Sequence, residues 1–166
     1  MNVAFLGLGG NIGNRFENLR KTTQLLEEFC GKIEKYSSVY ETDAWGSDSK
    51  NRYFNQVIEL HTHLNVEILL EKTLRIEEKL GRNRHGDQNS DRTVDIDILF
   101  FNDSVINSEQ LEIPHPRLHL RKFVLIPLCE LSSALCHPVL KKNMKDLLNN
   151  CDDKLKVTKV SFRQNT

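Results

Sequence analysis

The spacing of apolar residues along the first 101 positions constrains the fold more than any other feature of this chain. Apolar side chains recur at helical spacing over residues 14–30 and 65–80, whereas strand-like runs cover residues 2–8, 33–42, 53–64 and 93–101. The resulting order, strand–helix–strand–strand–helix–strand, is that of the ferredoxin-like split βαβ arrangement. We therefore predict an α+β fold: a mainly antiparallel sheet, helices packed on one face of it, and a C-terminal extension that adds further cover.

Capping residues mark the beginnings of both helices. Asn14, with Glu17 three residues later, resembles a capping box. Asn65 precedes the second apolar stripe, and we expect it to cap that helix. Glycines follow both helices. We expect Gly9-Gly10-Asn11 to end the first strand, and the polar stretches 43–52 and 82–92 to be loops.

The last third of the chain is less regular. Pro114 and Pro116 argue against a central strand in the segment 104–126. We expect Pro127 to begin a short helix, residues 141–150 to form another, and 156–162 to be a final edge strand.

Length and charge narrow the classes of protein that remain. A chain of 166 residues without a break in composition suggests one domain, 1–166. The 23 basic and 23 acidic residues balance, which argues against a nucleic-acid or membrane-surface binder. We see no membrane-spanning run and no signal peptide. The four cysteines lack C-x-x-C spacing, so we expect reduced thiols and a cytoplasmic protein.

The sequence Asp95-Ile96-Asp97 is the sharpest chemical signal. In a strand the two carboxylates point to one face, about 6.5–7 Å apart, while Val94, Ile96 and Ile98 point into the core. Paired carboxylates suit Mg²⁺, which takes oxygen ligands and shares its shell with water and phosphate, and they could bracket two ions. The alternative is a pair of solvated aspartates, although Asp is rare in strands.

Cationic side chains flank the aspartates on both sides in the sequence. These are Arg82, Arg84, His85 and Arg92 before them, and His115, Arg117, His119, Arg121 and Lys122 after them. Guanidinium groups match phosphate oxygens, so metal-binding carboxylates beside cations suggest phosphoryl transfer. A solvated basic loop is the alternative, and His115 with His119 could instead bind zinc, although no HExxH motif or cysteine supports this.

Two further segments are less specific. Gly7-Leu8-Gly9-Gly10 has the wrong spacing for a dinucleotide-binding loop, and we interpret it as a tight turn with a close backbone approach. Tyr53 and Asn55 share one strand face, where an amide could recognise the polar edge of a heterocycle. Phe123 and Trp45 could stack on such a ring, but each aromatic could equally be an ordinary packing residue.

Together these residues resemble a known family over nearly the whole chain, from Val3 to about Leu148. The family is 6-hydroxymethyl-7,8-dihydropterin pyrophosphokinase, of the folate pathway. The resemblance is carried by Gly7–Asn11, Tyr40-Glu41-Thr42, Tyr53-Phe54-Asn55, Arg75-Ile76-Glu77, Gly81-Arg82-Asn83-Arg84, Arg92–Ile98, Ile113-Pro114-His115 and Arg121–Leu128. The R-T-x-D-x-D-I sequence followed by P-H is the most specific part.

The resemblance implies a reaction and a set of residue roles. Pyrophosphate would pass from ATP to the pterin alcohol, giving AMP and the pterin diphosphate, with two Mg²⁺ ions held by Asp95 and Asp97. The catalytic residues would be Arg82, Arg92, Asp95 and Asp97. The ATP site would comprise Glu77, Arg82, Arg84, Arg92, Ile98, His115 and Arg121. The pterin site would comprise Thr42, Tyr53, Asn55 and Phe123. The partners would be these small molecules, with no nucleic acid or membrane, and we expect a monomer.

The chain departs from the family pattern at three places. Gly10 stands where the family usually has Ser. Asn89 replaces an aromatic residue that would help close over the pterin, and Ser90-Asp91 replace Gly-Pro. Asp43-Ala44-Trp45 occupies a loop that commonly contains proline, and we expect Trp45 to supply the missing ring as part of the pterin site.

Two rival functions remain open at this point. One is a ferredoxin-like RNA-binding module, although the chain lacks the aromatic run and the basic surplus of such domains. The other is a catalytically inactive relative that retains the fold as a nucleotide sensor. Binding of an ATP analogue and of pterin, with and without Mg²⁺, separates these possibilities.

Overall fold

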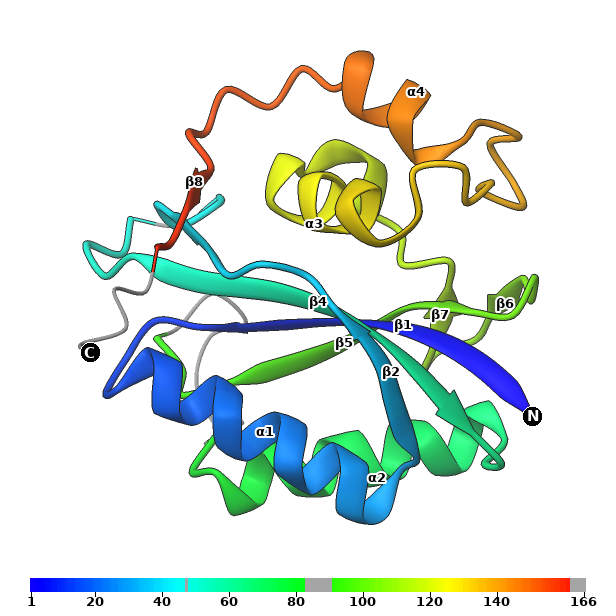
Figure 1. The fold of residues 1–166 in the computed structure, drawn as a ribbon, viewed down its shortest axis with the longest axis horizontal. Coiled ribbons are helices and arrows are strands. Elements are labelled where there is room, and N and C mark those ends of the chain that lie inside the picture. The colour runs from blue at the N-terminus through cyan, green and yellow to red at the C-terminus, as the bar shows by residue number, and fades with distance from the viewer. Residues whose placement is uncertain (47, 83–90, 162–166) are drawn as a thin grey trace.

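The computed structural model of the chain describes residues 1–46, 48–82 and 91–161 (Figure 1). In chain order the elements are β1 (Asn2–Gly10), α1 (Arg15–Phe29), β2 (Lys32–Tyr36), β3 (Tyr40–Thr42), β4 (Tyr53–Thr62), α2 (Val66–Lys79), β5 (Asp95–Phe101), β6 (Ile106–Asn107), β7 (Glu112–Ile113), the 3₁₀ helix η1 (Leu118–Leu120), α3 (Lys122–Ser132), α4 (Met144–Asn149) and β8 (Thr158–Lys159). The predicted order of elements and the α+β class are confirmed.

The main sheet has the strand order β5-β1-β4-β3-β8, and β2 also pairs with β4. Its pairings are antiparallel, and β1 lies between β4 and β5. This interlocking of the two strand–helix–strand units is the split βαβ arrangement. A small separate sheet joins β6 to β7. The last strand pairs with β3 at the sheet edge, as predicted, but is shorter than expected.

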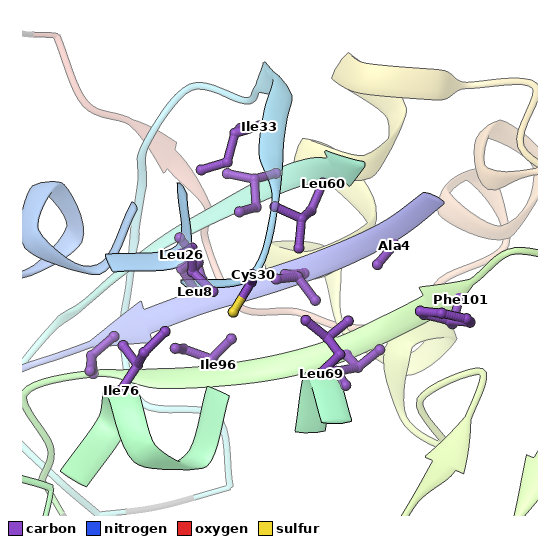
Figure 2. Close-up of a cluster of buried hydrophobic side chains, with 14 of the residues drawn as sticks. Ala4, Leu8, Leu26, Cys30, Ile33, Leu60, Leu69, Ile76, Ile96 and Phe101 are labelled. Carbon is purple, nitrogen blue, oxygen red and sulfur yellow. The ribbon is translucent and has the colours of Figure 1, made fainter. Parts of the chain in front are cut away.

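Helices cover both faces of the sheet, not one as the sequence suggested. Figure 1 shows α1 and α2 on one face and α3 and α4 on the other. The first core lies between the sheet and α1 and α2, as the labelled side chains of Figure 2 show; its members include Leu8, Leu26, Leu60, Leu69 and Ile96. The second core, around Phe100, Leu125 and Leu128, fills the space under α3 and α4. The extension is therefore a second covering layer.

Both predicted helix caps are present. The Asn14 side-chain oxygen accepts a hydrogen bond from the Glu17 backbone N–H at 3.0 Å. The Asn65 side-chain oxygen does the same for the Ile68 N–H at 2.9 Å. Each bond satisfies a backbone donor that the first helical turn leaves open, so helix position follows closely from sequence here.

Three local predictions were wrong. The strand predicted over 33–42 is divided into β2 and β3, because the Ser37 side chain accepts the Val57 N–H at 2.9 Å between them. Gly7-Leu8-Gly9-Gly10 does not form the predicted turn, since β1 continues to Gly10, although the close backbone approach predicted there is present, between Gly10 and Thr93. Pro127 lies inside α3 instead of beginning it. The hydrogen bond that this proline cannot donate is outweighed there by burial of neighbouring apolar side chains such as Leu125 and Leu128.

Two expectations about the whole chain can be compared with this structure. The four cysteines, Cys30, Cys129, Cys136 and Cys151, are free thiols. Among residues 1–46, 48–82 and 91–161, no helix has the length and apolar character needed to cross a membrane.

Candidate active site

A cavity of about 300 Å³ opens where the polar ends of β3, β4 and β5 meet the start of α3. It contains carboxylates, guanidinium groups and aromatic rings within one space. The lining residues are Thr42, Asp43, Ala44, Trp45, Tyr53, Asn55, Arg82, Arg92, Asp95, Asp97, His115, Arg117, Arg121 and Phe123.

The two aspartates share one face of β5, as strand alternation predicts. Val94, Ile96 and Ile98 are buried on the opposite side, in the first core. Gly9 is the partner of both Asp95 and Asn55 in the neighbouring strands. A Cβ atom at Gly9 would lie 3.1 Å from Asp95 Oδ1 and 3.2 Å from Asn55 Oδ1. The absence of a side chain at Gly9 therefore lets the two polar groups approach each other across the cavity floor.

Ion pairs hold two arginines beside the aspartates. Arg92 Nη1 lies 2.9 Å from Asp95 Oδ2, and Arg92 Nη2 donates to the Tyr53 hydroxyl at 3.4 Å. Arg82 Nη1 lies 2.7 Å from Glu77 Oε1, which also accepts the Ile96 N–H at 2.6 Å. The buried Glu77 thus connects Arg82 to the strand that carries the aspartates.

Burial raises the pKa of both Asp95 and Asp97 above the usual value for Asp. For Asp95 the neighbouring carboxylate of Asp97 adds to this shift, whereas Arg92 and Arg82 oppose it. The charged pair is therefore unfavourable without a further cation, and this is the electrostatic setting in which a divalent metal ion binds.

The raised pKa of Asp95 also makes the thermal stability of the protein depend on pH. A carboxyl group whose pKa is higher in the folded than in the unfolded protein lowers the free energy of unfolding as pH rises. This loss begins near the pKa in the unfolded protein and is complete above the pKa in the folded protein. In EDTA, Asp95→Asn should therefore gain thermal stability relative to wild type as pH increases from 4 to 8. Thermal unfolding across that range measures the gain, with Asp103→Asn in an exposed turn as the control. A gain that shrinks as pH rises would contradict the assignment.

Arg121, a third arginine of the cavity lining, lies against two aromatic rings. Its guanidinium carbon is 4.6 Å from the centre of the Trp45 ring and 5.6 Å from that of Phe123. Burial lowers the pKa of Arg121 from its ordinary value. Its Nε is buried and has no hydrogen-bond partner within the part of the chain that the structure describes. A buried donor of this kind is suited to an anionic ligand.

His115 is fixed in an uncharged state. Its Nδ1 accepts the Arg117 N–H at 3.1 Å, and its own backbone N–H donates to Leu99 at 3.0 Å. Burial, helped by the positive charges of Arg121 and Arg117, lowers the pKa of His115 to about 4. At neutral pH this side chain therefore acts as a neutral hydrogen-bonding group.

One wall of the cavity, formed by β3 and β4, carries uncharged polar side chains. Asn55 is buried, and its Nδ2 donates to the Thr42 hydroxyl at 3.0 Å. Tyr53 lies on the same strand face as Asn55, as the sequence indicated. This wall, with Phe123 and Trp45 near it, could hold a flat heterocycle by its edge and its face.

The structure brings most of the predicted site residues to this one cavity. The exceptions are Glu77, which contacts Arg82 from behind β5, and Ile98, whose side chain is in the first core. Arg84 and Asn89 lie outside the described residues. Asp43, Ala44 and Arg117 line the cavity without having been assigned a role. Arg117 belongs to the cationic cluster noted in the sequence, and its two-residue spacing from His115 was the available signal.

The donor set matches a hard cation better than zinc. Among the described residues, no group of three or more His, Cys, Asp or Glu side chains could hold a metal ion. His119, which the sequence offered with His115 as a zinc ligand, packs its ring edge-on against His137, with 6.3 Å between ring centres. Two carboxylates fit Mg²⁺, which completes its coordination with water and phosphate oxygens.

Comparison with known proteins agrees with this chemistry. Residues 5–133 match the family model for 7,8-dihydro-6-hydroxymethylpterin-pyrophosphokinase (HPPK). A 2-amino-4-hydroxy-6-hydroxymethyldihydropteridine pyrophosphokinase from Bacillus subtilis (strain 168) is 44% identical over 131 residues, covering 78% of each chain. The protein of that name from Aquifex aeolicus (strain VF5) is 38% identical over 146 residues, covering 88% of this chain and 90% of the relative.

A solved structure is similar in fold. Wild-type Plasmodium falciparum HPPK-DHPS superposes with a TM-score of 0.71 at 20% identity, over 90% of this chain and 43% of the longer one.

Proposed function

Because the chain belongs to the 7,8-dihydro-6-hydroxymethylpterin-pyrophosphokinase (HPPK) family, we propose that the cavity described above is its active site. The family activity is transfer of pyrophosphate to hydroxymethyldihydropterin in folate synthesis, and the chain is a diphosphotransferase with ATP as co-substrate. The assignment of the cavity rests on one observation. Paired carboxylates, four arginines and a wall suited to a heterocycle line the same space.

In this proposal the phosphates of ATP lie along the charged side of the cavity. Arg82, Arg92 and Arg121 neutralise charge on the β- and γ-phosphates. Neutral His115, whose Nδ1 accepts the Arg117 N–H, donates a hydrogen bond there through Nε2. Arg84, Glu77 and Ile98 remain expected members of the nucleotide site. Mg²⁺, held by Asp95 and Asp97 as two ions, would supply charge neutralisation between the phosphates when bound.

The pterin occupies the polar wall formed by β3 and β4. Asn55 and Thr42 read its polar edge, and Tyr53, Phe123 and Trp45 contact its ring. This arrangement aims the hydroxymethyl oxygen at the β-phosphorus. The new oxygen–phosphorus bond forms as the bond between the β-phosphorus and the oxygen bridging to the α-phosphate breaks. AMP leaves in line with that oxygen, and the hydroxyl proton of the pterin passes to water. The protein's contribution is thus positioning and electrostatics.

We extend the proposal to the setting in which the enzyme works. One chain supplies the lining residues described, so a monomer is sufficient for activity. Its partners are ATP and the pterin, with no nucleic acid or membrane. Use of ATP and four free thiols favour the cytoplasm.

Equilibrium titration tests the assignment of the two walls. A non-hydrolysable ATP analogue should bind much more tightly with Mg²⁺ than with EDTA, because the aspartate pair repels the phosphates when no metal is present. In Asp95→Asn this difference should be strongly reduced. Equal dependence on Mg²⁺ in the variant and the wild type would place the metal elsewhere.

Trp45 provides a separate test of the pterin wall. Trp45→Ala should weaken pterin binding by about 1 kcal/mol, the size of an aromatic stacking contact, while Trp45→Phe should retain most of the affinity. Because the chain has one tryptophan, quenching of its fluorescence by pterin reports on this residue alone. Unchanged emission together with unchanged affinity in Trp45→Ala would remove Trp45 from the pterin site.

A further inference from the structure

The carboxylate of Asp91 joins three segments that are far apart in the sequence. Its Oδ1 accepts hydrogen bonds from Asn11 Nδ2 at 2.7 Å and from Ser49 Oγ at 2.5 Å. Its Oδ2 accepts a hydrogen bond from Asn51 Nδ2 at 2.6 Å. Asp91, which directly precedes Arg92, is thereby connected to the end of β1 and to the 43–52 loop. These bonds lower the pKa of Asp91, so the acceptor is charged at neutral pH.

Asn11 transmits this arrangement to Arg92. The Asn11 side-chain oxygen accepts the Arg92 backbone N–H at 2.8 Å, and the Asn11 backbone N–H donates to the Arg92 carbonyl at 3.0 Å. Asn11 is buried, and its amide has one orientation that satisfies both neighbours. The NH₂ group must face the Asp91 carboxylate, and the oxygen must face the Arg92 N–H. Asp91 therefore fixes the side chain that holds the Arg92 backbone.

Close packing at the end of β1 supports the same arrangement. A Cβ atom at Gly10 would lie only 2.2 Å from the carbonyl oxygen of Thr93. Residues 92–93 can therefore lie directly against β1 only because position 10 has no side chain. The backbone of Arg92 is consequently set by packing on one side and by Asn11 on the other.

Both substrate walls depend on these contacts. The Arg92 side chain reaches Asp95 at 2.9 Å and the Tyr53 hydroxyl at 3.4 Å. Ser49 and Asn51 belong to the loop that carries Trp45. We propose that Asp91 is a positioning residue, which fixes the Arg92 guanidinium through Asn11 and the Trp45 loop through Ser49 and Asn51. The proposal rests on the proposed function for the roles of Arg92 and Trp45.

An exchange of hydrogen-bond polarity tests the connection between Asn11 and Asp91. Asn11→Asp keeps an oxygen for the Arg92 N–H but places two carboxylates against each other. Its kcat/KM should fall by at least about tenfold, since small displacements of a positioned group are costly. Adding Asp91→Asn restores a donor–acceptor pair in reversed order, so the double variant should recover most of the loss. If the double variant is as impaired as Asn11→Asp, or more so, the proposed pairing is wrong.

A surface variant keeps the proposal testable if Asn11→Asp does not fold. Asp91→Ala removes all three acceptor contacts at an exposed position. Asp48→Ala, the matched control, removes an exposed carboxylate from the 43–52 loop that carries Trp45. Asp91→Ala should lower Trp45 fluorescence anisotropy without ligand and reduce kcat, whereas Asp48→Ala should change neither.

These readouts separate the proposal from the assignment of function. The anisotropy needs no substrate, so it reports on the loop even if the reaction has been placed in the wrong cavity. Unchanged anisotropy and unchanged kcat in Asp91→Ala would overturn the positioning role. Absence of pterin diphosphate from the wild-type reaction would instead count against the proposed function.

Discussion

Asp97→Ala and Asp97→Asn are expected to reduce pyrophosphate transfer by about 10³-fold or more, even at saturating Mg²⁺. Asp97 is one of the two carboxylates in the cavity, and stabilisation of developing charge is the largest contribution that such a site makes. The measurement is the initial rate of pterin diphosphate formation. Asp95→Asn is measured in the same assay, and a smaller loss there is compatible with unequal sharing of the ions.

The loss of activity should not come from loss of the fold. Burial raises the pKa of Asp97, so its charge opposes folding in the metal-free protein. Asp97→Asn should therefore unfold in EDTA at a temperature no lower than wild type. Asp103→Asn, in an exposed turn, serves as the control for both measurements. Turnover near the wild-type rate in either Asp97 variant would remove this residue from the metal site.

Asn55→Ala is expected to weaken pterin binding by about 1–3 kcal/mol, which corresponds to roughly 5- to 150-fold in Kd. Asn55 is buried between Thr42 and the cavity, so its removal leaves polar groups of the ligand without partners. Affinity for the ATP analogue should change far less. Isothermal titration with each ligand separates the two effects.

Gln56→Ala provides the matched control for this second prediction. Gln56 is the next residue of β4, and its side chain donates to the Ser37 carbonyl at 2.9 Å. The substitution therefore removes a comparable hydrogen bond outside the cavity lining, and pterin affinity should be retained. Loss of ATP-analogue binding in Asn55→Ala with pterin binding intact would show that the two walls have been exchanged.

Sequence reasoning succeeded where a local rule determines the geometry. Asn14 and Asn65 cap their helices because a short side-chain amide placed just before a helix reaches a backbone donor of the first turn. Asp95 and Asp97 share a face because the period of a strand is two. Most of the cavity lining followed from such positions combined with the family resemblance.

Sequence reasoning failed where contacts between distant segments decide the outcome. The predicted close backbone approach at Gly10 is present, but the turn is not, and the sequence did not show that the approaching backbone is that of Thr93. Pro127 looked like a helix start, but burial beneath α4 sustains α3 through it. The face that the extension covers also depends on this tertiary packing. No local pattern carries that information.

The most direct test is a mass-resolved assay of the wild-type protein with ATP, Mg²⁺ and 6-hydroxymethyl-7,8-dihydropterin. Attack on the β-phosphorus predicts AMP and pterin diphosphate in equal amounts, with formation of both suppressed by EDTA and by Asp97→Asn. Formation of ADP with pterin monophosphate, or of AMP and pterin diphosphate at unchanged rates in Asp97→Asn, would contradict the account of this cavity.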